Sequence, residues 1–214
     1  MRGEWTGSAL AGPAMAYTDF TLESVETDLG VTPRPGPVFR NLADVEPPSW
    51  LPAQLARGME LALISEKSRS EFIVAPILLA VRELSGGRVA ILSGQRLDVD
   101  PARRLSGECD FLLSRSDPLP RLRAPLLAVV EAKRNDIEGG LGQCAAQMVA
   151  ARLFNERAGS PARPVYGCVT TGEDWQFLRL DPAGLLVDNS RRYINLVGAV
   201  LAALLAAVSP DGEA

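Results

Sequence analysis

Residues 124–133 read Ala124-Pro125-Leu126-Leu127-Ala128-Val129-Val130-Glu131-Ala132-Lys133. The apolar run that follows the proline predicts a buried strand. Side chains alternate between the two faces of a strand, so Glu131 and Lys133 emerge on the same face at its end. Burying two charges at such a position is energetically unfavourable unless they pair with each other or bind a ligand. The stretch therefore predicts a central strand that ends in a polar site.

A second apolar run, Gly107-Glu108-Cys109-Asp110-Phe111-Leu112-Leu113, precedes the first and carries Asp110. On neighbouring strands, Asp110 and Glu131 would supply two carboxylates, and the backbone carbonyl of Ala132 a third oxygen, which is the ligand type that Mg²⁺ prefers. Lys133 would orient or deprotonate the attacking water, or neutralise charge in the transition state. The two runs together predict a metal-dependent phosphodiesterase site.

The amino-acid composition excludes several classes of catalytic mechanism. The chain has 214 residues, no histidine and a formal net charge of −4. Without histidine, Ser-His-Asp, Cys-His and His-metal mechanisms are excluded, which leaves carboxylates, lysine or metal-bound water as general bases. The acidic balance argues against a protein that coats nucleic acid by bulk charge. Three widely spaced cysteines in apolar surroundings predict buried free thiols and a cytoplasmic location: Cys109, Cys144 and Cys168.

The predicted elements follow the order helix, three strands, helix, two strands, helix. This order predicts an α/β fold in which helices flank a mixed central β-sheet. We expect a loose leader over residues 1–16, an N-terminal helix with a proline-rich connector over 17–50, a single domain over 51–208, and a tail over 209–214.

Apolar residues at helical spacing predict four helices before the last one: Thr21–Leu29, Pro52–Ile64, Glu66–Leu84 and Ile137–Arg157. Pro76 should kink the third of these or displace its start.

Towards the C-terminus, Leu185–Val187 is expected to be a short edge strand. The apolar stretch Tyr193–Val208 contains Asn195 and is shorter than the ~20 residues that a membrane span needs. We therefore expect a buried C-terminal helix and no membrane partner.

The succession of Asp110, then Glu131-Ala132-Lys133, then a helix resembles the signature of the PD-(D/E)XK nuclease superfamily. The resemblance implies a restriction-endonuclease-like core, Mg²⁺ or Mn²⁺ as cofactor and DNA as substrate. It also implies that Asp110, Glu131 and the Ala132 carbonyl bind the metal and that Lys133 is catalytic. Cys109 departs from the pattern, which often has proline there.

The segment Glu66-Lys67-Ser68-Arg69-Ser70-Glu71-Phe72-Ile73-Val74-Ala75-Pro76-Ile77-Leu78 extends this resemblance. It looks like the helix opening in the N-terminal nuclease domain of type I restriction motor subunits, where a glutamate stands about three turns before Pro-x-Leu. This implies that Glu66 is a further metal ligand or acid, with Glu71 as the weaker candidate. The two are five residues apart, so a regular helix cannot point both at one site.

Gln143 and Gln147 form an i,i+4 pair on the predicted helix that follows Lys133. They resemble a Gln-x-x-x-Tyr element, with Gln147 at the tyrosine position, which implies that Gln143 orients Lys133 or contacts the substrate phosphate. The plainer interpretation is a solvent-facing polar patch, but the apolar stripe lies elsewhere on that helix. This helix and the run Gly167–Leu178 also resemble uncharacterised small nuclease-like proteins common in cyanobacteria.

Three functions stay open at this point. The favoured one is a Mg²⁺-dependent DNA nuclease in restriction, repair or mobile-element defence, acting alone or as a homodimer. The alternative is an inactive member of the fold that binds DNA or serves in assembly. A nucleotide phosphohydrolase would use the same carboxylates, but no glycine-rich phosphate loop supports it. Four loop arginines are expected near the metal end, where they would contact phosphates or solvent: Arg103, Arg104, Arg121 and Arg123.

Overall fold

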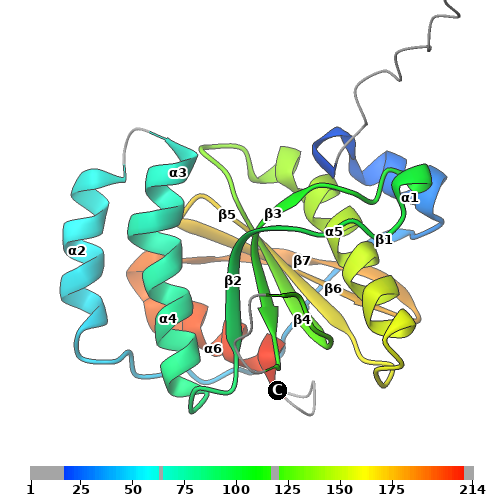
Figure 1. Cartoon of the computed structure of the whole chain (residues 1–214). Helices are drawn as coiled ribbons and strands as arrows, with labels where there is room; N and C mark the ends of the chain where they lie inside the picture. Colours follow the sequence, from blue (N-terminus) through cyan, green and yellow to red (C-terminus); the bar gives the residue numbers. More distant parts are fainter. Residues whose placement is uncertain (1–16, 63–64, 117–120, 210–214) are drawn as a thin grey trace, which may run out of the picture.

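A seven-stranded mixed sheet forms the centre of the molecule, with helices on both of its faces (Figure 1). The computed structural model describes residues 17–62, 65–116 and 121–209, so the predicted leader and most of the predicted tail lie outside the described residues. The strand order is β1-β7-β6-β5-β4-β3-β2. The predicted fold class, an α/β protein with helices around a mixed central sheet, is confirmed.

The seven strands are β1 (Pro33–Gly36), β2 (Ala90–Arg96), β3 (Glu108–Ser114), β4 (Leu126–Ala132), β5 (Val165–Thr170), β6 (Asp174–Asp181) and β7 (Gly184–Tyr193). The described helices are α1 (Leu22–Leu29), α2 (Leu51–Leu61), α3 (Glu66–Arg69), a π-helical turn (Ser70–Val74), α4 (Ala75–Leu84), α5 (Ile137–Arg157) and α6 (Val197–Val208), with short 3₁₀ turns at Tyr17–Asp19, Pro101–Arg103 and Ile194–Leu196.

Strand pairing brings the predicted site residues to one end of the sheet. β2, β3 and β4 form an antiparallel meander, and α5 then crosses over so that β5 runs parallel to β4. Phe111 in β3 pairs with Val130 in β4. Because these strands are antiparallel, the beginning of β3, with Asp110, lies beside the end of β4, with Glu131.

The sheet separates two hydrophobic cores. One core lies under α5 and α1 and includes Val129, while the other lies under α2, α4 and α6 and includes Val130. All seven residues of β4 are buried, which matches its continuous apolar sequence. In Figure 1, α2, α3 and α4 stand on one side of the sheet and α1 and α5 on the other. The end of β4 therefore lies between the helices on one face of the sheet and the helices on the other.

The start of α5 is packed unusually closely against its surroundings. The Asp136 carboxylate caps the helix by accepting a hydrogen bond from the Gly139 amide at 2.8 Å. A Cβ on Gly140 would lie 2.7 Å from Val169 Cγ1 and 3.1 Å from Lys133 Cγ, and one on Gly142 would lie 2.3 Å from the Phe20 carbonyl oxygen. These glycines let α5 approach both the end of β4 and the N-terminal segment.

The predicted helix over residues 66–84 is present but contains a change of helical type. α3 passes into the π-helical turn, whose i→i+5 pattern is seen in the Ala75 amide donating to the Ser70 carbonyl, and α4 follows. Pro76 stands in the first turn of α4, where its missing N–H is tolerated best. The wider turn directly before the proline is the local adjustment that Pro76 was expected to require.

Two strand predictions are wrong. The proline-rich connector contains β1, which pairs in parallel with β7 at the edge of the sheet, where proline is tolerated. Leu185–Val187, expected to be a short edge strand, is part of the ten-residue β7, which lies between β1 and β6. α1 also packs on α5. Residues 17–50 therefore contribute to the same sheet and core as the rest of the chain.

The C-terminal apolar stretch forms α6, most of whose residues are buried. Among the described helices none combines the length and the apolar character that crossing a bilayer requires.

Candidate active site

Asp110 and Ala132 link the two central strands at their polar end. The backbone N–H of Ala132 donates to Asp110 Oδ2 at 2.7 Å. In a regular strand the N–H and C=O of one residue point to the same side, so the Ala132 carbonyl also faces β3. Asp110 is partly buried, and its pKa is raised by burial and, less strongly, by the charges of Glu66 and Glu108. Two of the predicted oxygen ligands are thus neighbours.

Glu131 is enclosed by three side-chain donors. Its Oε1 accepts hydrogen bonds from Lys133 Nζ at 3.0 Å and from Gln143 Nε2 at 2.5 Å, and its Oε2 accepts one from Gln147 Nε2 at 3.0 Å. The residue is only 3% exposed. Burial, helped by the charge of Asp110, raises the pKa of Glu131 to about 7 in spite of these donors.

Lys133 is held between two acceptors. Its Nζ donates to Gln143 Oε1 at 2.9 Å as well as to Glu131, and its backbone amide donates to the Thr170 carbonyl in β5 at 2.7 Å. Burial lowers the pKa of Lys133, but the charge and hydrogen bond of Glu131, together with the charges of Glu66 and Asp110, outweigh burial and the pKa is raised. Lys133 is therefore an ammonium at neutral pH, suited to orienting water and neutralising negative charge.

Glu66, rather than Glu71, belongs to this group of residues. Glu66 is the first residue of α3, and its Oε1 accepts a hydrogen bond from the Arg134 amide at 3.2 Å. Its charge acts on both Asp110 and Lys133. Glu71 instead pairs with Lys67 at 3.8 Å on the surface, although both line the adjacent cleft. The five-residue spacing separates the two glutamates as expected.

A cleft of about 880 Å³ opens beside these residues, between the α3–α4 helix and the β2–β3 edge of the sheet. Its acidic lining consists of Glu66, Glu71, Glu108 and Asp110, and its cationic lining of Lys67 and Arg134. Ala75, Leu79, Ile91 and Phe111 form the apolar part. Glu131 and Lys133 do not line the cleft but lie behind Asp110 and Ala132, so a substrate would approach from the Asp110 side.

The donor set fits a small, hard cation. Among residues 17–62, 65–116 and 121–209, no three Asp, Glu or Cys side chains form a metal-ligand cluster. The predicted set needs only two carboxylates and one carbonyl. Two donors occupy Glu131 Oε1, so of its four lone-pair sites the free one is on Oε2. Glu131 would therefore bind a metal through one oxygen, with Asp110 and the Ala132 carbonyl beside it.

The two glutamines are not on a polar surface. Gln143 is 6% exposed and Gln147 is fully buried, and α5 is buried on all sides from Gly140 to Ala151. Both the alternative of a solvent-facing patch and the premise of a separate apolar stripe are therefore wrong. The i,i+4 spacing was the correct signal, because it lets both amides reach the same carboxylate.

Of the four loop arginines, only Arg103 and Arg104 belong to the connection at this end of the sheet, between β2 and β3. The loop that contains Arg121 and Arg123 joins the end of β3 to the start of β4, which is the opposite end from Asp110. Arg104 pairs with Asp28 and lies 4.4 Å over the ring of Phe20, so it braces α1. The expectation of phosphate contacts near the metal is wrong for Arg121 and Arg123 because a hairpin places its loop far from the other strand ends.

The structure thus brings together Asp110, Glu131, Lys133 and Gln143, adds Gln147 and Glu66, and leaves Glu71 at the rim. Glu108 was missed, although it stands two residues before Asp110 on the same face of β3. No protein-family model matches the chain, and no curated protein matches it either.

Proposed function

We propose that the protein is a Mg²⁺-dependent nuclease of the PD-(D/E)XK type that hydrolyses phosphodiester bonds in DNA in the cytoplasm. One observation carries the proposal: the Lys133 ammonium is held by Glu131 Oε1 and Gln143 Oε1 at the strand end where Asp110 faces the cleft. A fixed ammonium beside a pair of carboxylates is an arrangement that phosphoryl transfer to water uses, since negative charge develops on the transferred group.

The residues divide the work by position. Asp110, one oxygen of Glu131 and the Ala132 carbonyl would hold the cation, with Glu66 as an additional carboxylate. A bound Mg²⁺ would polarise the scissile phosphate and lower the pKa of a coordinated water. Lys133 orients that water and offsets the charge on the phosphate oxygens, and Gln143 holds the ammonium in place. Gln147 fixes the opposite oxygen of Glu131.

The test is cleavage of plasmid and linear DNA with Mg²⁺, Mn²⁺ or a chelator. We expect Lys133→Ala to cleave at least ~100-fold more slowly than the wild type, the usual loss when a positioned catalytic group is removed. Lys67 is the chain's other lysine and is exposed on the cleft rim, so Lys67→Ala is the matched control, with a change of a few-fold at most. Equal cleavage by wild type and Lys133→Ala would remove the assignment of Lys133.

A second candidate is a nuclease-fold module that binds DNA without cutting it. It is favoured by the three donors that already occupy most of the acceptor sites of Glu131 and by the lack of a cluster of three potential metal ligands among the described residues. Calorimetric titration with Mg²⁺ and Mn²⁺ separates the two candidates. Binding that disappears in Asp110→Asn supports the nuclease, and DNA binding without any cation binding supports the module.

A further inference from the structure

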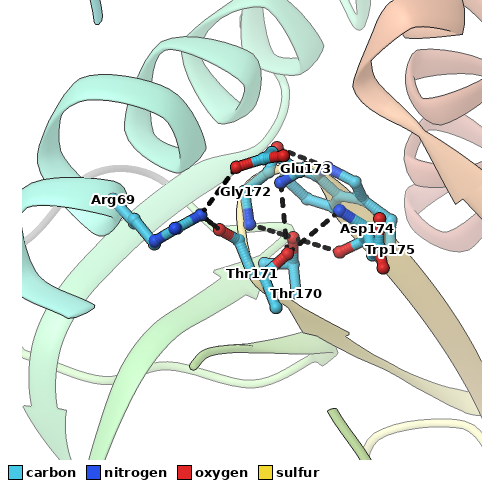
Figure 2. A network of polar contacts seen from close by, with 7 residues as sticks. All are labelled: Arg69, Thr170, Thr171, Gly172, Glu173, Asp174 and Trp175. Atoms are coloured by element: carbon cyan, nitrogen blue, oxygen red, sulfur yellow. Dashed lines mark hydrogen bonds and ion pairs between the residues drawn. The ribbon is translucent and has the colours of Figure 1, made fainter. Parts of the chain in front are cut away.

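Arg69 occupies a buried position between the helix that carries Glu66 and the turn that follows β5. Its side chain is 11% exposed. Arg69 Nη1 donates to the Thr171 carbonyl at 2.8 Å and to Glu173 Oε1 at 3.1 Å (Figure 2). Its Nε is buried without a hydrogen-bond partner among the described residues. Both hydrogen bonds are made by one nitrogen, so Arg69 ties α3 to this turn through a single guanidinium N–H group.

The turn that receives Arg69 is rigid. Thr171 Oγ1 accepts hydrogen bonds from the amides of Glu173 and Asp174, and the Trp175 indole donates to the Gly172 carbonyl (Figure 2). Gly172 has a φ of 86°, which favours glycine. A Cβ there would lie 3.2 Å from Ile73 of the π-helical turn. The turn therefore presents a fixed carbonyl and a fixed contact surface to the helix.

Three contacts then close a ring around the candidate site. Glu66 accepts from the Arg134 amide, the neighbouring Lys133 amide donates to the Thr170 carbonyl, and the neighbouring Thr171 carbonyl accepts from Arg69. Glu66 and Arg69 are one helical turn apart on α3, so the ring returns to its start. In this ring Glu66 is held to the end of β4 from one side and Arg69 to the end of β5 from the other.

We propose that Arg69 is a positioning residue that fixes Glu66 against the end of β4. The argument rests on the proposed function for the role of Glu66, but the contact itself does not depend on a cation. A cation would compete with the Arg134 amide for the Glu66 carboxylate, and Arg69 would then be the polar tie that keeps α3 seated. The π-helical turn lies between α3 and α4, so the i→i+4 hydrogen bonding of a regular α-helix does not run unbroken from α4 to Glu66 and Arg69.

The direct test is hydrogen exchange of the Arg134 amide, followed by NMR. We expect this amide to exchange at least ~10-fold faster in Arg69→Met, as fast as in Glu66→Ala, while amides in the core of α5 keep their wild-type rates. Glu173→Gln is the matched control, because it removes the exposed ion pair and leaves the Thr171 carbonyl. An unchanged Arg134 amide in folded Arg69→Met would overturn the proposal. If Arg69→Met does not fold, Arg69→Gln, whose side chain is too short to span to the Thr171 carbonyl, takes its place and must show the same acceleration.

A second measurement uses Mn²⁺ affinity in a double-mutant cycle. We expect Arg69→Met to weaken Mn²⁺ binding about 10-fold in the wild type and not at all in Glu66→Gln, since Arg69 acts through Glu66. Equal losses in both backgrounds would show a general structural effect and overturn the proposal. A wild type that binds no divalent cation would instead contradict the proposed function, and the exchange of the Arg134 amide would still decide the role of Arg69.

Discussion

The side chain of Asp110 replaces main-chain pairing between β3 and β4 at the polar end of the sheet, because the Ala132 amide donates to Asp110 Oδ2 rather than to a carbonyl. The carboxylate thus serves two purposes at once. It completes the hydrogen bonding of the strand end, and it contributes a carboxylate to the lining of the cleft. An asparagine could perform the first task but not the second.

Because these two tasks need different properties of the side chain, we expect Asp110→Asn to keep or raise the stability of the protein and to abolish its activity. The raised pKa of Asp110 means that folding disfavours its charge, so an uncharged isostere that keeps the acceptor should stabilise the protein by roughly 0.5–2 kcal/mol at neutral pH. The same change should abolish cation binding and DNA cleavage. Urea unfolding and a cleavage assay on one preparation check both effects, and a destabilised variant would contradict the first.

The raised pKa of Glu131 predicts that the free energy of unfolding falls as the pH rises. Its pKa is raised to about 7 in the folded protein, so between its ordinary pKa and pH 7 the folded state retains a proton that the unfolded chain has released. The free energy of unfolding therefore decreases as the pH rises through this window, by on the order of 3 kcal/mol, and levels above it. The raised pKa of Asp110 adds a slope of the same sign.

Urea unfolding at pH 5 to 8 measures this profile without added metal. Glu131→Gln should flatten it, whereas Glu26→Gln on the exposed face of α1 should leave it unchanged. A wild-type profile that rises with pH across the same window would show that Glu131 is ionised in the folded state at low pH.

Lys133 should remain protonated well into the alkaline range. Burial lowers its pKa, but the charges of three carboxylates, chiefly that of Glu131, outweigh burial and raise it. Removing the Glu131 charge in Glu131→Gln should therefore lower the pKa of Lys133 from its wild-type value, because the opposing effect of burial remains. The chain has two lysines, so NMR of lysine-labelled protein yields two side-chain signals, and Lys67→Arg identifies which one belongs to Lys133. A Lys133 pKa that does not respond to Glu131→Gln would contradict the ion pair.

Two glycines of α5 allow a matched comparison of packing. Gly140→Ala would press a Cβ against Lys133 and Val169, and Gly142→Ala would press one against the backbone of Phe20 and Thr21. Both should destabilise the protein by about 1–3 kcal/mol, the usual cost of overpacking. Only Gly140→Ala should also slow DNA cleavage, because it displaces Lys133 from Gln143. Equal loss of cleavage in both variants would mean that α5 moves as a whole.

The central part of the fold and site could be read from local sequence. β4 is a continuous apolar run that ends in Glu131, and it follows the apolar run of β3 closely along the chain, so Asp110 and Glu131 could be placed on neighbouring strands before any coordinates. Gln143 and Gln147 were found by their spacing, but their burial was not, because glutamine on a helix is ordinarily a surface residue. Tertiary packing of α5 on the sheet determines that burial.

Other features had no adequate local signal. β1 contains Pro33 and Pro35 and reads as a connector, since proline weakens any strand prediction and only the edge position beside β7 makes it acceptable. Arg69 reads as an exposed helix cation, and its role depends on the Thr171 carbonyl about 100 residues further along the chain. Contacts between such distant segments are set by topology, which single-sequence patterns do not encode.

The π-helical turn from Ser70 to Val74 also determines which mutations this segment of the chain can tolerate. Such a turn is equivalent to one residue inserted into an α-helix, so the loss of a single codon there would restore regular α-helical winding. Residues on either side would then rotate by about 100° relative to each other. With α4 anchored in the core, Glu66 and Arg69 would turn away from β4 and β5. Point substitutions across this segment should be tolerated far better than a one-residue deletion.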